Sequence, residues 1–387
     1  MIKVGIVVQR YGKDIVGGAE TLARDVAERL NASGFDVTVF TTTAKDYVTW
    51  ENHYPAGESI LKGVLIKRFD TAEERNMESF NAFSSVFFNQ PPQERDEQRW
   101  IREQGPYVPA LMEALKHEQK DFDVFLFFTY LYYTTVEGLK AVDKPAVLFP
   151  TAHDEAPIYM ELMKDVFRRP EALFFLTGAE MAFVKKTFNP PHITELIRTG
   201  LDIDDTVDEA LFKKNYLQFA PYMVYAGRIE KGKGLEPVFE AFREVRSKRL
   251  INLVLMGKKL MDIPEIEGLK YVGFVSEAEK LSAFKGALLS VQPSPVESLS
   301  ITTLESFSQG TPVLVNKRSD VLCEHIDISG GGLAYENVDE FIRHFYTIYD
   351  KRKIRKEMGV KGYDYVRTYY SWDAVMSILQ RQIRAII

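Results

Sequence analysis

The chain has 387 residues, of which 45% are hydrophobic and 27% are charged, and its formal net charge is −6. This length allows two or three domains with real hydrophobic cores, and the composition is ordinary for a soluble globular protein. The negative charge balance argues against a general nucleic-acid-binding protein.

Short apolar runs typical of buried strands alternate with helical periodicity along most of the chain. The sequence predicts strands at 3–8, 37–42, 64–69, 124–128, 146–150, 173–177, 194–198, 222–226, 252–256, 269–274, 288–291 and 312–315. The alternation indicates parallel α/β sheets with helices on both faces. Because so many strands exceed one comfortable doubly wound sheet, we expect two domains, 1–200 and 201–370, joined near residues 199–202.

The first predicted strand is followed by paired glycines in the sequence GGAE at 17–20, which open a helix predicted at 19–30. Glycine lets the backbone approach a ligand closely, and N–H groups at a helix N-terminus can face an anion. The stretch lacks the G-x-G-x-x-G pattern of a dinucleotide fingerprint.

The segment 71–107 mixes charges with aromatic residues and is broken by Pro91 and Pro92. Phe80, Phe83 and Phe87 share one helical face, which favours a helix packed on the first domain. The alternative is a mobile flap over an acceptor site or against a membrane.

Two stretches place polar residues where strands end. His153 follows the strand at 146–150, and the sequence YAGRIEKGKG at 225–234 carries Arg228 and Lys233 in a glycine-rich turn before a helix predicted at 235–249. Ligands of open α/β sheets bind at the carboxyl ends of the strands. A guanidinium and an ammonium group at such a turn suit a diphosphate, although exposed basic residues in a loop are an equal alternative.

The stretch PSPVESLSITTLESFSQGTPVL at 293–314 carries Glu297 in a loop and Glu305 about one turn into a helix predicted at 301–309, with Gly310 at its end. The backbone N–H groups of 299–302 then lie near a helix N-terminus and suit a phosphate. Carboxylates beside a phosphate are better suited to binding hydroxyl groups attached to it. The tail 338–387 is predicted to be helical, with breaks at Gly359 and Ser371.

Taken together, anion donors, two cations, two carboxylates and one imidazole suit a sugar nucleotide held in a cleft between two domains. The motifs GGAE at 17–20, HD at 153–154, G-R-x₄-K-G at 227–234 and E-x₇-E at 297–305, followed by GTPV at 310–313, resemble those of the retaining glycosyltransferases of family 4. That resemblance implies the GT-B fold: two Rossmann-like, doubly wound parallel-sheet domains facing a central cleft. A C-terminal helix from Trp372 would cross back, so that 371–387 completes the first domain.

The resemblance also implies roles for individual residues. Glu297 and His153 would act at the donor sugar as catalytic residues, Glu305 would bind the ribose hydroxyls, and Phe274 and Val275 would bind the base. The remaining implied residues hold the donor diphosphate, and they are Gly18, Arg228, Lys233, Ser300, Ile301 and Thr302. Leu299 and Ser300 depart from the usual Phe-Gly of the family, where a Cβ at Ser300 could crowd the sugar and its hydroxyl could bind it.

The implied function is transfer of a hexose, with retention, from a UDP- or GDP-sugar, UDP-glucose favoured, to a saccharide or lipid-linked acceptor in polysaccharide or glycan biosynthesis. No cofactor and no metal are expected. The D-x-D patterns at 121–123 and 202–204 lie before a strand and at the domain boundary. The alternatives are a non-catalytic subunit that binds a sugar nucleotide, and an epimerase or phosphorylase of the same fold.

The single cysteine allows no intramolecular disulfide, and six scattered histidines give no zinc-type spacing. The N-terminal apolar run is too short for a signal peptide, and the longest apolar run, at 123–136, is too short to span a bilayer. A cytoplasmic protein is therefore expected, and peripheral contact with the inner face of a membrane remains compatible with the sequence.

Overall fold

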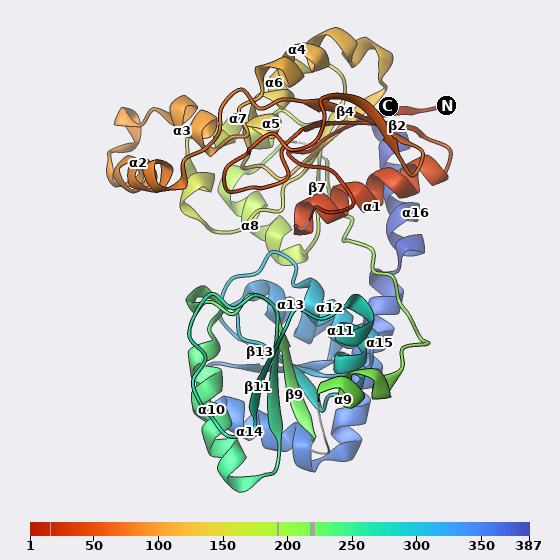
Figure 1. Cartoon of the computed structure of the whole chain (residues 1–387). Helices are drawn as coiled ribbons and strands as arrows, with labels where there is room; N and C mark the ends of the chain where they lie inside the picture. The colour runs from red at the N-terminus through yellow and green to blue at the C-terminus, as the bar shows by residue number, and fades with distance from the viewer. Residues whose placement is uncertain (16, 192, 217–220) are drawn as a thin grey trace. The chain divides into compact units, whose positions relative to one another are not determined.

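The computed structural model describes residues 1–15, 17–191, 193–216 and 221–387. The chain divides into two compact units, both built from strands and helices that alternate along the sequence (Figure 1). Unit 1 comprises Met1–Thr199 together with Met376–Ile387, and unit 2 comprises Gly200–Val375. The sequence had suggested boundaries after residues 200 and 370.

Unit 1 is built around a sheet with the strand order β3-β4-β2-β1-β5-β6-β7-β8. All neighbours pair in parallel except β3, which runs antiparallel to β4 at the edge of the sheet. The order reverses between β1 and β5, which makes the sheet doubly wound. The strands are β1 Lys3–Val7, β2 Asp36–Thr42, β3 Gly57–Leu61, β4 Val64–Phe69, β5 Val124–Phe128, β6 Ala146–Phe149, β7 Ala172–Phe175 and β8 Ile193–Leu196.

Helices cover both faces of this sheet, with α1 on one side and α4 and α6 on the other (Figure 1). The helices are α1 Gly18–Ala32, α2 Met77–Asn89, α3 Glu97–Gln104, α4 Pro109–Glu118, α5 Tyr133–Val136, α6 Gly138–Ala141, α7 Met163–Arg168 and α8 Gly178–Phe188, with short 3₁₀ turns η1 Pro92–Glu94, η2 Gln119–Asp121 and η3 Ala156–Tyr159. In α2, Phe80 and Phe87 are buried in the core and Phe83 packs against it. The prediction that this segment is a helix packed on the first domain is therefore confirmed.

Unit 2 contains a parallel sheet with the strand order β11-β10-β9-β12-β13-β14. Numbered from β9, this is the 3-2-1-4-5-6 order of the Rossmann fold, in which ligands bind where the order reverses. That point lies between β9 and β12, which are paired neighbours. The strands are β9 Tyr222–Ala226, β10 Asn252–Met256, β11 Leu269–Gly273, β12 Leu289–Gln292, β13 Val313–Asn316 and β14 Gly332–Tyr335.

Alternate residues of β9 enter two different cores, as expected for a strand buried on both faces. Met223 and Tyr225 pack with α10 and α14, whereas Tyr222, Val224 and Ala226 pack with α9 and α11. The helices of this unit are α9 Glu209–Tyr216, α10 Leu235–Lys248, α11 Glu277–Gly286, α12 Ile301–Ser308, α13 Asp320–Ser329, α14 Val338–Asp350 and α15 Arg352–Tyr369, with the 3₁₀ turn η4 Lys231–Lys233. The final helix, α16 Trp372–Ile386, begins in unit 2, and its residues from Met376 onward belong to unit 1.

One sequence expectation is wrong, and two strands were missed. The helical break expected at Gly359 is wrong, because α15 runs through that residue. A Cβ at Gly359 would lie 2.1 Å from the carbonyl oxygen of Gly310, so the glycine serves close packing. Strands β3 and β14 were not predicted: β3 is exposed and lacks an apolar run, and β14 begins with a glycine.

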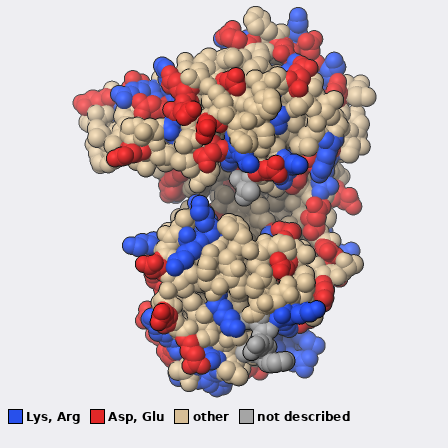
Figure 2. All heavy atoms as spheres, in the orientation of Figure 1, with Lys and Arg blue, Asp and Glu red and all other residues tan. Residues whose placement is uncertain are grey.

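Acidic and basic side chains are interspersed over the face of each unit seen in Figure 2. Within the described ranges, no helix is long and apolar enough to cross a membrane. The same residues include no group of three or more His, Cys, Asp or Glu side chains arranged to hold a metal ion.

Candidate functional site

The motif at 293–314 adopts the expected strand–loop–helix–strand arrangement at the point where the order of strands reverses in unit 2. Glu297 lies in the loop after β12, and Glu305 lies in the second turn of α12. Gly310 follows the helix with φ +68°, and its N–H donates to the carbonyl of Phe307. The prediction of a helix closed by a left-handed glycine is confirmed.

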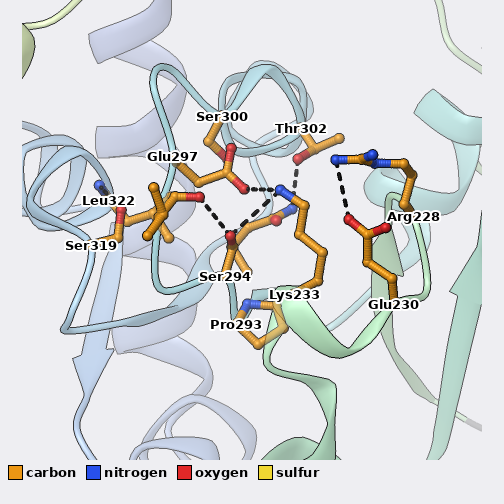
Figure 3. Close-up of polar contacts among 12 residues, drawn as sticks. Arg228, Glu230, Lys233, Pro293, Ser294, Glu297, Ser300, Thr302, Ser319 and Leu322 are labelled. Carbon is orange, nitrogen blue, oxygen red and sulfur yellow. Dashed lines mark hydrogen bonds and ion pairs between the residues drawn. The ribbon is translucent and has the colours of Figure 1, made fainter. Parts of the chain in front are cut away.

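The glycine-rich turn after β9 packs directly against this loop. Gly234 has φ +69°, and a Cβ there would lie 2.5 Å from the carbonyl oxygen of Pro293, so only glycine fits without a shift. The close approach brings Lys233 to the loop. Its Nζ lies 2.7 Å from Oε1 of Glu297 and 3.5 Å from Oγ of Ser294 (Figure 3).

Arg228, on the same turn, has a carboxylate neighbour of its own. Its Nη2 lies 3.1 Å from Oε1 of Glu230, and the Arg228 side chain is half exposed (Figure 3). The expected pair of cations therefore lies beside the glutamate loop, and each cation contacts an acid. A phosphate group arriving here would compete with Glu230 and Glu297 for them.

The N-terminus of α12 begins with a residue in an unusual conformation. Ser300 caps the helix with φ 61° and ψ 69°, a left-handed conformation that costs free energy for any residue with a Cβ. Its carbonyl accepts the N–H groups of Thr303 and Leu304, and its hydroxyl lies 2.9 Å from that of Thr303. Ile301 and Thr302 are the first two helical residues, so their N–H groups have no partner within the helix.

Glu305 is buried, with 6% of its surface exposed. Its Oε1 lies 2.8 Å from Nζ of Lys280, while Oε2 is buried and has no hydrogen-bond partner among the described residues. Burial raises the pKa of this carboxyl group to about 7, against the opposing effect of Lys280. A buried oxygen that lacks a donor is an acceptor ready for a ligand hydroxyl.

The two residues assigned to the base follow β11. Phe274 is 79% exposed, and Val275 packs against the core formed with α9 and α11. Both lie at the carboxyl end of the sheet, as do Arg228 and Glu297, because β9, β11 and β12 are all parallel members of it. An exposed aromatic ring at this edge could stack on a planar base.

In unit 1, the paired glycines open α1, which begins at Gly18 rather than at residue 19. A Cβ at Gly17 would lie 2.2 Å from Oε2 of Glu20, whereas a Cβ at Gly18 would meet no atom within 4 Å. Glu20 is buried and accepts hydrogen bonds from Gln9 and Arg10. Gly17, which the motif alone did not distinguish from its neighbour, is thus the glycine that this packing requires.

His153 lies in the loop after β6, next to acids that the sequence analysis missed. Its Nε2 lies 3.4 Å from Oε2 of Glu155, whose Oε1 accepts a hydrogen bond from the hydroxyl of Tyr130. Hydrogen bonding to Glu155 raises the pKa of His153, although burial opposes it. An imidazole that is charged more readily than usual could face a phosphate or a sugar oxygen.

Beneath this loop lies Glu180, which is buried with 3% of its surface exposed. Its two oxygens accept the N–H groups of Ala152, at 2.7 Å, and Leu176, at 3.0 Å. Burial raises the pKa of Glu180 to about 7, more than these hydrogen bonds lower it. The Thr177-x-x-Glu180 pattern at the start of α8 is a capping signal that sequence reasoning could have used.

Most of unit 2 matches a known protein family. Residues 207–365 match the family model described as "Glycosyl transferases group 1". Over this segment the chain is similar to the glycosyl transferases of group 1. The segment lies wholly within unit 2 and contains Arg228, Lys233, Glu297 and Glu305, so the family resemblance of these motifs is confirmed.

One curated relative is the lipopolysaccharide 1,2-N-acetylglucosaminetransferase of Salmonella typhimurium, which is 26% identical over 189 residues. The match covers 44% of this chain and spans only half the length of that relative.

Solved structures match the whole chain at low identity. Sucrose-phosphate synthase from Thermosynechococcus elongatus has a TM-score of 0.73 at 16% identity, and Anabaena HepE in complex with UDP and glucose has a TM-score of 0.71 at 13% identity. Each match covers 100% of both chains. At such identities the likeness shows the fold, and it confirms the expected GT-B class of two parallel-sheet α/β units.

Proposed function

We propose that the protein is a retaining glycosyltransferase that moves a hexose from a nucleotide-diphosphate sugar, with UDP-glucose favoured over a GDP-sugar, to a saccharide or lipid-linked acceptor. Three findings support this: the match of residues 207–365 to the group 1 family model, the Salmonella relative that is named for lipopolysaccharide transfer, and the likeness to HepE, which was solved with UDP-glucose. We place the activity in polysaccharide or glycan biosynthesis. A lipid-linked acceptor would bring the protein to the inner face of a membrane as a peripheral enzyme.

The observation that carries the proposal is the buried Oε2 of Glu305, which has no donor among the described residues. Burying a carboxylate oxygen without a partner is costly, so a site that keeps one is prepared for a donor from outside. Ribose hydroxyls are such donors. They would bind Glu305 from α12, while the base stacks on Phe274 and meets the backbone of Val275.

The diphosphate would then lie at the N-terminus of α12. Ile301 and Thr302 would donate backbone N–H groups, Ser300 would line the turn, and the positive end of the helix dipole favours the negative charge. Arg228 and Lys233 would exchange their carboxylate partners for phosphate oxygens. Gly18, at the first turn of α1, would offer its backbone from unit 1. These groups neutralise the diphosphate without a metal ion, and no cofactor takes part.

In the reaction, the bond between the anomeric carbon and the phosphate oxygen breaks while the acceptor oxygen bonds to the same face of the sugar. The acceptor proton passes to the departing phosphate oxygen. Positive charge develops at the anomeric carbon, and Glu297 would stabilise it electrostatically. His153 would contact the donor sugar, and its raised pKa would help it face the negative charge of the leaving group.

A non-catalytic sugar-nucleotide-binding subunit is the second candidate. The left-handed Ser300 favours it, because this position is usually glycine in the family and a Cβ there narrows the space for a sugar.

A panel of UDP-glucose, UDP-galactose, UDP-N-acetylglucosamine and GDP-mannose distinguishes the two candidates. Thermal unfolding should identify the donor, because ligand stabilises the folded state in proportion to the logarithm of concentration over Kd. Slow release of free sugar, with the α-anomer detected first by NMR when the donor is an α-linked sugar, supports a retaining transferase. Stabilisation without any sugar release or transfer identifies the binding subunit, and stabilisation by none of the four refutes both.

A further inference from the structure

A buried histidine in unit 2 contacts the glutamate loop and takes no part in the proposed chemistry. His325 lies on α13 and has no exposed surface. Its Nε2 lies 2.7 Å from the carbonyl oxygen of Leu299, and its Nδ1 lies 3.0 Å from the hydroxyl of Tyr365. That hydroxyl in turn lies 3.1 Å from the hydroxyl of Tyr370, at the end of α15.

The direction of these hydrogen bonds follows from their chemistry. A carbonyl oxygen can only accept, so Nε2 of His325 must carry a hydrogen and donate it to Leu299. In the neutral ring Nδ1 is then an acceptor, and the hydroxyl of Tyr365 donates to it. Because the hydroxyl hydrogen of Tyr365 is donated to Nδ1, the hydroxyl of Tyr370 is the donor in its contact with the hydroxyl of Tyr365. The tyrosine hydroxyls thereby favour the tautomer that can hold Leu299.

Leu299 occupies a critical position in the loop. It lies two residues after Glu297 and directly before Ser300, whose left-handed conformation turns the chain into α12. The hydrogen bond from His325 fixes the peptide group that leads into this unfavourable turn, and the contact between the hydroxyls of Ser300 and Thr303 fixes the other side. The direction of the Ile301 and Thr302 N–H groups depends on the same turn.

We propose that His325 is a positioning residue that holds the 297–300 loop and the first turn of α12 in the geometry that binds the donor diphosphate, with Tyr365 fixing its tautomer. The expected effect of His325 on activity rests on the proposed function. The expected effect of His325 on the loop rests on the hydrogen bonds of its imidazole ring. His325 acts through the carbonyl of Leu299, which lies 2.7 Å from its Nε2.

Two substitutions at His325 separate the roles of its ring nitrogens. His325→Gln extends an amide N–H to about the reach of Nε2 and can still donate to Leu299, whereas His325→Asn ends nearer to Nδ1 and cannot. We expect His325→Asn to lower kcat about tenfold and to weaken UDP binding about fivefold, the effect of losing roughly one hydrogen bond to a buried acceptor. His325→Gln should stay within about threefold of the parent for both quantities.

Hydrogen exchange measured by mass spectrometry adds a readout that does not depend on catalysis. The amides of residues 297–303 should exchange faster in His325→Asn than in His325→Gln and the parent, because a looser turn opens more often. Tyr365→Phe, a milder change that removes the donor to Nδ1 and the acceptor of the Tyr370 hydroxyl, should show the same increase to a smaller degree.

Tyr222→Phe is the matched control. Tyr222 is also fully buried, and its hydroxyl donates to the carbonyl of Ala283 at 2.7 Å, on a face of the sheet that packs with α9 and α11. Tyr222→Phe should lower Tm about as much as Tyr365→Phe does, and it should change neither kcat nor the hydrogen exchange of the amides of 297–303.

The assignment is overturned if His325→Asn and His325→Gln agree in UDP affinity and in exchange, or if Tyr222→Phe reproduces the loosening. If the parent itself turns over no donor, the proposed function fails, and exchange at 297–303 still decides the role of His325.

Discussion

Nζ of Lys233 lies 2.7 Å from Oε1 of Glu297, so the cation expected to hold the donor diphosphate is paired with the acid expected to face the donor sugar. The two side chains are 23% and 18% exposed, so water screens the attraction between their charges only in part. The contact makes Glu297 a competitor of the phosphate for Lys233, in addition to any role in turnover.

Replacing Glu297 by Gln should therefore separate binding from catalysis. Lys233 loses a charged partner and becomes freer to bind phosphate, so UDP should bind as tightly as to the parent or a few-fold more tightly. Turnover should fall about 100-fold, because the carboxylate no longer stabilises the charge at the anomeric carbon. Calorimetry with UDP and a donor-turnover assay measure the two effects.

Glu230→Gln is the control for this variant, since Glu230 contacts the other cation, Arg228, at 3.1 Å. It should tighten UDP binding slightly and leave turnover unchanged. A Glu297→Gln protein that loses UDP affinity as strongly as turnover would contradict the assignment.

Glu305→Gln should weaken UDP binding by about one to two orders of magnitude, because a hydrogen bond to a charged group contributes roughly 1.5–3 kcal/mol. Since the ribose contact is the same in the ground and transition states, kcat at saturating donor should change little. Glu277→Gln is the matched control: Glu277 contacts the same Lys280, at 2.9 Å, from an exposed position. UDP affinity that falls equally in both variants would assign the effect to Lys280 and remove the ribose role.

The sequence predicted the parts of the site that local rules determine. Residues at the carboxyl ends of parallel strands meet at one edge of a sheet, so the strand pattern alone placed Arg228 and Glu297 on one side of unit 2. Gly310, with Pro312 two residues further on, marked the end of α12 equally well.

The sequence could not show which side chains pair across the fold. Lys233 and Glu297 are 64 residues apart, and Glu305 meets Lys280 only because α11 packs beside α12. The break wrongly expected at Gly359 has the same origin. The low helix propensity of glycine is visible in the sequence, whereas the close approach of Gly310, which requires a glycine at 359, arises only in the folded protein.

Transfer should persist after treatment with EDTA and removal of the chelator. Two cations and the α12 amides are expected to neutralise a diphosphate, and one aspartate of each D-x-D pattern has another contact. Oδ2 of Asp123 accepts the backbone N–H of Lys3 before β5, and Oδ1 of Asp204 accepts from Thr206. Activity that disappears in EDTA and returns with manganese would refute this expectation.

Gly359→Ala should destabilise the protein although alanine is the better helix former. The added Cβ would lie 2.1 Å from the carbonyl oxygen of Gly310, and backbone on both sides leaves little room to relax. Overpacking of this kind costs about 1–3 kcal/mol or more. Gly232→Ala, whose Cβ would meet no atom within 4 Å, should stay within about 0.5 kcal/mol of the parent. Urea unfolding of both variants tests the comparison, and equal midpoints would show that α15 shifts freely.

Glu180 should make stability depend on pH near neutrality. Burial raises its folded-state pKa to about 7, above the ordinary value of 4.5 that it has when unfolded. The protonated carboxyl group is therefore favoured by folding, and its stabilising contribution is fully present below pH 4.5 and is lost as the pH rises through 7.

Glu180→Gln isolates this effect, because the amide stays neutral and nearly the same in shape throughout. The free energy of unfolding of the parent, relative to that of Glu180→Gln, should decrease by roughly 3 kcal/mol between about pH 5 and pH 8. Parallel pH profiles for parent and variant would show that Glu180 does not titrate in this range.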